Sequence, residues 1–353
     1  MINNQLTLNS YSLEELNQLF LDWGEPAYRA KQVFEWIGRG KRVEEMTNIS
    51  KILREKLTSI PFGDVTVVRR LVSAKDGTIK YLFKLHDNNL IEGVLMKYKY
   101  GNTLCISTQV GCNMGCAFCA STLEGCVRNL QSGEMLYEVM AVENEEKTEE
   151  EKNRVVTNIV LMGSGEPLDN YENTVRFLKT VSSPDGINIS QRNISLSTCG
   201  LVDKIYSLPE DEIHVTLSIS LHAPNDQIRS RIMPISKAYS IKELLNAAKF
   251  YSEKTGRRVI FEYALIKGVN DSYENALELS KQFRNINCHV NLIPLNTVKE
   301  RNLVGVTRAE AQEFCNYLEK LHISATIRRE MGSDIDGACG QLRRRVISEG
   351  GAK

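Results

Sequence analysis

The sequence contains no apolar run that approaches the length needed to cross a bilayer. Its start, Met1 to Gln5, has neither a basic n-region nor an apolar h-region, so no secretory signal is expected. Positive and negative side chains balance at 44 and 44, which gives no overall signal for nucleic-acid binding. These absences favour a cytoplasmic protein without a membrane partner. Any nucleic-acid contact must come from local basic patches.

Two common catalytic patterns are also missing. No Ser/His/Asp order and no dinucleotide fingerprint stands out, which argues against a hydrolase or an oxidoreductase. The composition is that of an ordinary globular protein, 42% hydrophobic and 25% charged, and 353 residues suffice for one large domain with an appendage or for two ordinary domains. In a cytosolic chain, nine cysteines are more typical of metal or thiol chemistry than of a disulfide scaffold.

Three of the cysteines stand close together. Cys112, Cys116 and Cys119 have a C-x3-C-x2-C spacing. Three thiolates so arranged can hold three irons of a [4Fe–4S] cluster and leave the fourth iron open to a substrate. A structural zinc site needs four ligands, and no histidine or fourth cysteine stands beside this run at zinc-finger spacing. Ordinary buried cysteines would have to fall on this spacing by chance.

The periodicity of apolar residues changes along the chain. Residues 1–60 have helical periodicity, with a capping box at Ser12-Leu13-Glu14-Glu15, and residues 65–104 have the alternation and turn pairs of a β-meander. From Cys105 onward, strand-like and helical stretches alternate, which favours parallel βαβ units in a barrel or partial barrel with its chemistry at the carboxyl ends of the strands. The expected strands are 103–107, 157–162, 193–198, 214–221, 259–265, 289–293 and 322–327, and the expected helices include 132–142, 171–181, 241–251, 275–284 and 308–321.

Further motifs identify a family. The stretches Gln109-Val110-Gly111-Cys112, Gly163-Ser164-Gly165-Glu166-Pro167-Leu168 and Asp336-Gly337-Ala338-Cys339-Gly340-Gln341-Leu342 follow one another in this order. Together with the cysteine triplet, they resemble the radical S-adenosylmethionine (SAM) superfamily and, within it, the RlmN/Cfr family of RNA adenine methyltransferases. The resemblance covers nearly the whole chain. It implies an α/β fold with an incomplete (β/α)6 radical-SAM barrel over residues 105–353, a β-meander over 63–104 and an N-terminal helical, RNA-binding accessory domain over 1–62.

The resemblance implies two cofactors, a [4Fe–4S] cluster and two SAM molecules per turnover. Cys112, Cys116 and Cys119 would hold the cluster. Glycines in the turn that follows strand 157–162 would let the backbone approach SAM, although glycine-rich turns after strands are common. The residues that match the SAM-binding positions of the family are Gly165, Glu166, Ser197, Ser220, Leu221, His222 and Asn296, of which His222 also fits an ordinary core histidine.

The family assigns reactive roles to three more positions. Cys339 matches the cysteine that becomes S-methylated and carries the resulting carbon radical to the adenine. Cys105 matches the resolving cysteine, which forms a transient disulfide with Cys339 and releases the covalent protein–RNA link. Glu92 matches the proton acceptor. Without the resemblance, a buried strand cysteine and a solvated glutamate would be the preferred interpretations of Cys105 and Glu92.

The implied substrate is adenosine 2503 of 23S rRNA, methylated at C2, together with an adenosine in tRNA. The nearest alternative is the Cfr branch, which methylates C8 of the same base, but the stretches 261–266 and 291–296 look more like RlmN. A non-catalytic Fe–S or zinc RNA-binding module is the alternative from another class. The resemblance also implies an electron donor such as flavodoxin or ferredoxin, and a monomer is the default expectation.

Charged clusters provide the expected RNA contacts. Arg328-Arg329 and Arg343-Arg344-Arg345 flank the Cys339 loop, and arginine suits phosphate binding. A third basic cluster lies near Lys41, where a solvated helix end is an equally good interpretation. The charge run 143–152 carries no motif and is expected to be solvated, away from the RNA.

Overall fold

The computed structural model describes residues 5–148, 153–295, 303–335 and 342, and its centre is a 10-stranded sheet. Neighbouring strands from β1 to β4 are antiparallel, whereas from β4 onward they are parallel. In spatial order the strands are β1 (Val65–Val72), β2 (Ile79–Leu85), β3 (Leu90–Tyr98), β4 (Gly101–Cys105), β7 (Asn158–Leu161), β8 (Ile194–Thr198), β9 (Thr216–Ser220), β10 (Val259–Leu265), β11 (Cys288–Pro294) and β12 (Ala325–Ile327).

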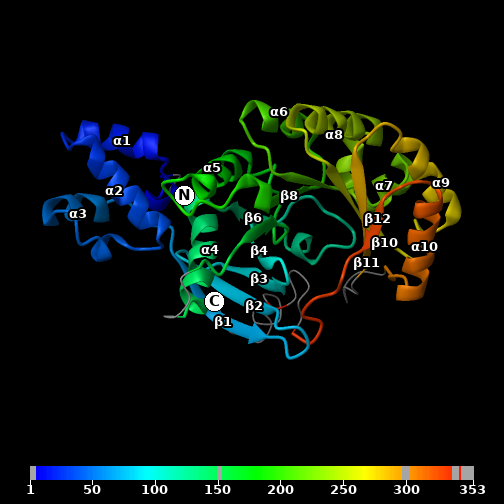
Figure 1. Cartoon of the computed structure of the whole chain (residues 1–353), viewed down its shortest axis with the longest axis horizontal. Coiled ribbons are helices and arrows are strands. Elements are labelled where there is room, and N and C mark those ends of the chain that lie inside the picture. Colours follow the sequence, from blue (N-terminus) through cyan, green and yellow to red (C-terminus); the bar gives the residue numbers. More distant parts are fainter. Residues whose placement is uncertain (1–4, 149–152, 296–302, 336–341, 343–353) are drawn as a thin grey trace.

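The parallel part of this sheet is an open barrel. Among the described residues, no pairing joins β12 to β1. Helices alternate with the parallel strands, as expected for (β/α) units, and Figure 1 shows them along the outer side of the sheet. The incomplete barrel and the meander are therefore confirmed. The helices are α4 (Ser132–Glu146), α5 (Tyr171–Ser182), α6 (Val202–Glu210), α7 (Asp226–Ile232), α8 (Ile241–Thr255), α9 (Tyr273–Gln282) and α10 (Arg308–Lys320).

The two faces of the sheet differ in polarity. On β10, Phe261 stacks on Phe283 and Tyr263 stacks on Phe314, so these rings face the helices. Because side chains alternate along a strand, Glu262 between them faces the inner side. Residues paired across neighbouring strands share a face. The pairs Val94–Cys105, Cys105–Val160, Val160–Ser195, Ser197–Ser218, Ser220–Glu262 and Glu262–Asn291 continue this inner face across the sheet, and much of it is polar.

The meander is continuous with the barrel. Strand β4 pairs antiparallel with β3 and parallel with β7, so the expected boundary between residues 104 and 105 falls inside β4. Glu92 on β3 and Cys105 on β4 consequently belong to the same sheet as the strands that follow them.

A helical segment precedes the sheet. Helices α1 (Leu13–Asp22), α2 (Ala27–Gly38) and α3 (Lys51–Thr58) lie at one end of the molecule, opposite α9 and α10 (Figure 1). The expected capping box is present: the Glu15 amide donates to Ser12 Oγ and the Ser12 amide donates to the Glu15 carboxylate. The segment is fixed to the start of α4 by Asn9, whose Nδ2 donates to the carbonyls of Gly63 and Gly133. None of the described helices is long and apolar enough to span a membrane.

The charge run after residue 142 differs from the expectation. Helix α4 continues to Glu146. Glu143 is buried and accepts hydrogen bonds from the amides of Val155 and Val156, and Glu146 pairs with Arg70. The prediction of a solvated run is therefore wrong for these two glutamates, because each lies where the end of α4 meets another segment.

Candidate functional site

The cysteine triplet lies on a loop that begins after a short ribbon. Strand β5 (Gln109–Gly111) pairs antiparallel with β6 (Cys126–Asn129), and the Cys112 amide donates to the Gly125 carbonyl at 2.9 Å. Gly111 has a φ of +81°, and a Cβ there would lie 2.0 Å from the Gly125 oxygen. Only glycine allows the ribbon to close at this point.

The loop is held from within and from α7. The Thr122 hydroxyl donates to the carbonyls of Cys116 and Cys119 at 3.2 and 3.0 Å. The Ala117 amide donates to the carbonyl of Ile232, the last residue of α7, at 2.8 Å. These hydrogen bonds fix the backbone between the second and third cysteines.

The thiols fit an iron–sulfur cluster. Cys112 and Cys116 are buried and Cys119 is half-buried. Burial, together with electrostatic interactions with the other thiols of the triplet, raises the pKa of Cys112 and of Cys116 to about 12. Thiolates here require a strong positive charge, which irons supply. Among the described residues, no three His, Cys, Asp or Glu side chains are placed to hold a single metal ion. In a cubane cluster, by contrast, each thiolate binds a different iron.

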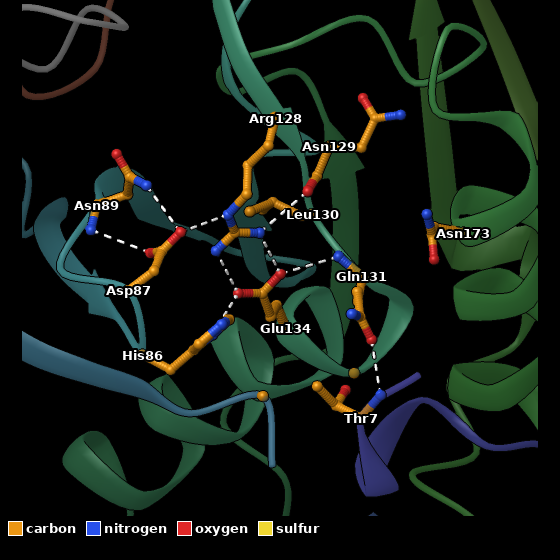
Figure 2. A network of polar contacts seen from close by, with 12 residues as sticks. Thr7, His86, Asp87, Asn89, Arg128, Asn129, Leu130, Gln131, Glu134 and Asn173 are labelled. Carbon is orange, nitrogen blue, oxygen red and sulfur yellow. Dashed lines mark hydrogen bonds and ion pairs between the residues drawn. The ribbon is translucent and has the colours of Figure 1, made fainter. Parts of the chain in front are cut away.

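A polar network anchors the strand that leaves this loop (Figure 2). Arg128 on β6 pairs with Asp87 at 2.6 Å and with Glu134 at 2.8 Å. His86 lies 3.3 Å from the same Glu134 carboxylate, which also accepts from the Gln131 amide at the start of α4. Arg128 thus joins the β2–β3 turn, the cluster loop and α4.

The glycines after β7 allow close backbone packing. Gly165 has a φ of +113°, and a Cβ there would lie 2.6 Å from Thr108 Oγ1 and 2.7 Å from the Gln109 nitrogen. At Gly163 a Cβ would lie 2.5 Å from the Ile106 oxygen. The sequence suggested glycines that admit a ligand. In the structure they let the β7 turn lie directly on the segment that leads into the cluster loop.

Glu166 connects two strand ends. Its buried carboxylate accepts from the amides of Leu168 at 3.0 Å and Cys199 at 2.7 Å, while its own amide donates to Gln109 Oε1 at 2.9 Å. Burial raises the pKa of Glu166, and the two amides oppose that rise. Both oxygens therefore already hold backbone donors, so the side chain organises the loops after β7 and β8.

His222 has the environment of a core histidine. Burial lowers its pKa to about 3, and its Nδ1 accepts from the Ala264 amide at 2.9 Å, so the ring is neutral. The ring also meets Phe118 of the cluster loop edge to face, with 4.8 Å between centroids. The side chain thus places the end of β9 beside the cluster loop, and Ser197 and Ser220 lie half-buried on the inner face nearby.

Glu92 and Cys105 lie on adjacent strands, on the inner face. Cys105 pairs directly with Val94, and Glu92 precedes Val94 by two residues on the same face. Both side chains are buried, 7% and 5% exposed. Lys80 of β2 lies 3.1 Å from Glu92 Oε2. The solvated glutamate expected from the sequence alone is wrong, because a buried lysine, which the sequence analysis did not single out, accompanies it.

The segment that leads toward Cys339 is anchored on the β1–β2 turn. Asp334 accepts from Ser73 Oγ at 2.6 Å and from the Ala74 amide at 2.9 Å, and the Gly332 amide donates to Asp76 Oδ2 at 2.9 Å. Met331 packs with the apolar group around Cys105. Arg328 and Arg329 are exposed just after β12. Three predicted sites lie outside the described residues: Cys339, Asn296 and the arginines 343–345.

Comparisons with known proteins agree with this geometry. The Radical SAM superfamily matches residues 106–280, and the Ribosomal RNA large subunit methyltransferase N-terminal domain matches residues 6–61. A probable dual-specificity RNA methyltransferase RlmN of Alkaliphilus oremlandii is 50% identical over 97% of this chain and 99% of its own length. Its namesake in Lachnoclostridium phytofermentans is 51% identical over 97% of this chain and 96% of its own length.

Comparison with a solved structure also indicates a radical SAM fold. The crystal structure of a radical SAM methyltransferase from Sphaerobacter thermophilus matches with a TM-score of 0.88 and 43% identity, covering 95% of this chain and 98% of that chain. Matches of this identity over nearly the full length establish common ancestry and not a shared barrel alone. The chain therefore belongs to the RlmN family of the radical SAM superfamily, and its cofactors are a [4Fe–4S] cluster and SAM.

Proposed function

We propose that the protein is a dual-specificity RNA methyltransferase that methylates C2 of adenosine 2503 in 23S rRNA and an adenosine in tRNA. The observation that carries this proposal is the placement of Glu92 and Cys105 on adjacent strands of one face, continuous with the strand ends around the cluster loop. A base and a thiol are what the chemistry needs beside the cofactors.

The reaction needs a carbon radical because C2 of adenine has no nucleophilic lone pair. When bound, the cofactors supply a methyl group to the sulfur of Cys339 and a 5′-deoxyadenosyl radical that removes a hydrogen atom from that methyl group. The carbon radical on Cys339 then attacks C2 and links the protein to RNA. The unpaired electron that this addition leaves on the adduct has to pass to an acceptor, and the cluster, when bound, would serve as that acceptor. Cys339 lies outside the described residues, so its role follows from the sequence motif.

Glu92 and Cys105 complete the transfer. The carboxylate of Glu92 accepts the proton that leaves C2. The thiolate of Cys105 attacks the sulfur of Cys339 and forms a disulfide; the bond from that sulfur to carbon breaks, and its electron pair stays on the carbon, where a proton completes the methyl group.

The remaining roles, which are cluster binding and SAM binding, belong to residues in the loops and at the strand ends. Cys112, Cys116 and Cys119 hold the cluster. Gly165, Glu166, Ser197, Ser220, Leu221, His222 and Asn296 bind SAM, with Glu166 and His222 acting through the backbone they position because their side chains have protein partners.

RNA is bound by the accessory domain, residues 1–62, and by the exposed Arg328 and Arg329 beside the barrel opening. The ammonium of Lys41 lies 2.8 Å from Glu45, which makes the arginines the stronger phosphate contacts. The target adenine is unstacked so that C2 can reach the thiol. We place the protein in the cytoplasm as a monomer that takes electrons from a donor such as flavodoxin or ferredoxin.

The deciding experiment is an anaerobic incubation of iron-reconstituted protein with an unmodified 23S rRNA fragment, SAM and a reductant, followed by nucleoside mass spectrometry. The expected product is 2-methyladenosine. Appearance of 8-methyladenosine would show that the protein methylates C8, as the Cfr branch does. Release of 5′-deoxyadenosine without methylated adenosine would reject the substrate, and a parallel incubation with tRNA tests the second target.

A further inference from the structure

Arg229 is a fully buried arginine on α7, directly after the end of β9. Its exposed fraction is 0%. Nε donates to the carbonyl of Leu221 at 3.2 Å, and Nη2 donates to the carbonyls of Cys199 at 2.7 Å and Ser220 at 3.2 Å. The guanidinium therefore bridges the backbone at the ends of β8 and β9.

Its charge has no ion-pair partner among the described residues, although the exposed carboxylate of Asp226 on the same helix favours it from a longer distance. Among the described residues, no carboxylate forms an ion pair or hydrogen bond with Arg229, and Nη1 is buried without a hydrogen-bond partner. An uncompensated buried cation costs several kcal/mol, so such a group is rarely kept without an anion close by. The unused donor indicates that the anion comes from a bound group.

The residues that would hold the cluster lie on this side of α7. The cysteine loop docks on the last residue of α7, and Cys116 and Cys199 share one apolar group with Ile232 and Met233. A [4Fe–4S] core with three thiolates carries one negative charge when oxidised and two when reduced.

We propose that Arg229 is the counter-charge of the iron–sulfur cluster, with Nη1 directed at it, and that it makes the cluster easier to reduce. A nearby fixed cation stabilises the reduced cluster more than the oxidised cluster because the reduced form has the larger negative charge. The proposal rests on the cofactors and not on the RNA target, so it stands or falls separately from the proposed function. The carboxylate of SAM is the other anion that Nη1 could meet.

The test compares anaerobically reconstituted full-length variants by redox titration followed by EPR, without SAM. Arg229→Gln removes the charge, Arg229→Lys keeps it, and Arg231→Gln removes an exposed charge from the same helix. We expect Arg229→Gln to lower the reduced-to-oxidised ratio at fixed potential more than tenfold, which corresponds to a midpoint more negative by over ~59 mV for a one-electron couple. Arg231→Gln should match the wild type, and Arg229→Lys should lie between them.

Two results overturn the proposal. One is an Arg229→Gln protein with full iron content and an unchanged midpoint. The other is a shift seen only after SAM is added, which would assign Nη1 to the carboxylate of SAM. If circular dichroism shows that the Arg229→Gln protein is folded but the protein holds no iron, the Arg229→Lys protein provides the test. A cluster with near-wild-type potential supports the counter-charge, whereas loss of iron there too means that the carbonyl bridges alone matter.

Discussion

The ammonium group of Lys80 lies 3.1 Å from Oε2 of Glu92, and the two side chains are 0% and 7% exposed on the inner face of β2 and β3. Lys80 is paired across the strands with Val94, which also pairs with Cys105, so the ion pair lies one strand away from the proposed resolving thiol. In a buried ion pair each charge offsets part of the desolvation cost of the other, and removal of one partner leaves the second charge uncompensated. Lys80 is therefore expected to hold the Glu92 carboxylate in position for proton transfer.

Replacing Lys80 by Met should leave Glu92 buried without this cation. We expect the free energy of unfolding to fall by about 3–5 kcal/mol in urea titrations of the apoprotein. Turnover should fall as well, because the carboxylate loses its fixed position. S-methylation of Cys339, which does not involve Glu92, should persist in mass spectra of the protein that folds.

The control for this experiment is Lys84→Met, which removes an exposed lysine from the same strand and should change neither stability nor turnover appreciably. The double variant Lys80→Met/Glu92→Gln should recover part of the lost stability, since both charges are gone. A double variant that is less stable by the sum of the two single effects would contradict the ion-pair argument.

Replacing Gly165 by Ala should disrupt the turn after β7. The new Cβ would lie 2.6 Å from Thr108 Oγ1, on a backbone with a φ of +113°. We expect a loss of about 2–5 kcal/mol from strain and overpacking together, and weaker SAM binding in equilibrium dialysis. Gly268→Ala is the matched control, because Gly268 also has a positive φ, +70°, but no atom lies within 4 Å of its added Cβ. Equal effects of the two substitutions would show that close packing at Gly165 is unimportant.

Local periodicity was sufficient to predict most of the fold. Strand β10 occupies the expected residues 259–265, because its apolar run is long and bounded on both sides. Helix α7 (Asp226–Ile232) was missed, since it is short and is held by contacts that Arg229 makes with distant backbone. The β5–β6 ribbon was also missed, because its two strands flank the cysteine loop and neither has a strong strand pattern.

The site residues were predicted from motifs, but the motifs did not predict which groups contact these residues in the folded protein. Nothing in Ile79–Leu85 shows that Lys80 is buried, because its pairing with Glu92 depends on strand register. Likewise, nothing in the Gly163–Leu168 motif shows that the Glu166 carboxylate accepts from the Leu168 and Cys199 amides. Motifs thus locate reactive residues, but the side chains that position them follow from tertiary packing.

The pair of His86 and Glu134 predicts a pH-dependent contribution to stability. The hydrogen bond to Glu134 raises the pKa of His86 above 6.5, with burial opposing it. The contribution is therefore fully present below pH 6.5 and is lost as the pH rises through the folded-state pKa. His86→Gln should lower the free energy of unfolding by less than about 1 kcal/mol at acidic pH, since His86 is 44% exposed, and by nearly nothing at a pH well above the folded-state pKa. The exposed His214→Gln serves as control in urea titrations at both pH values.

Alanine variants of the two reactive cysteines should stop the reaction cycle at different steps. Cys105→Ala lacks the proposed resolving thiol but keeps Cys339, so Cys339 should still be methylated and should still link to RNA. The linked species should then accumulate, and denaturing gels after incubation with the 23S rRNA fragment should show it. Cys339→Ala should bind iron normally yet show neither S-methylcysteine nor a link. Because Cys105 is only 5% exposed and packs with Val94 and Met96, alanine at this position leaves a small cavity, and iron content provides the check that the variant folds. Clean turnover by Cys105→Ala would reject the resolving role, and S-methylation at another cysteine in Cys339→Ala would reject the carrier.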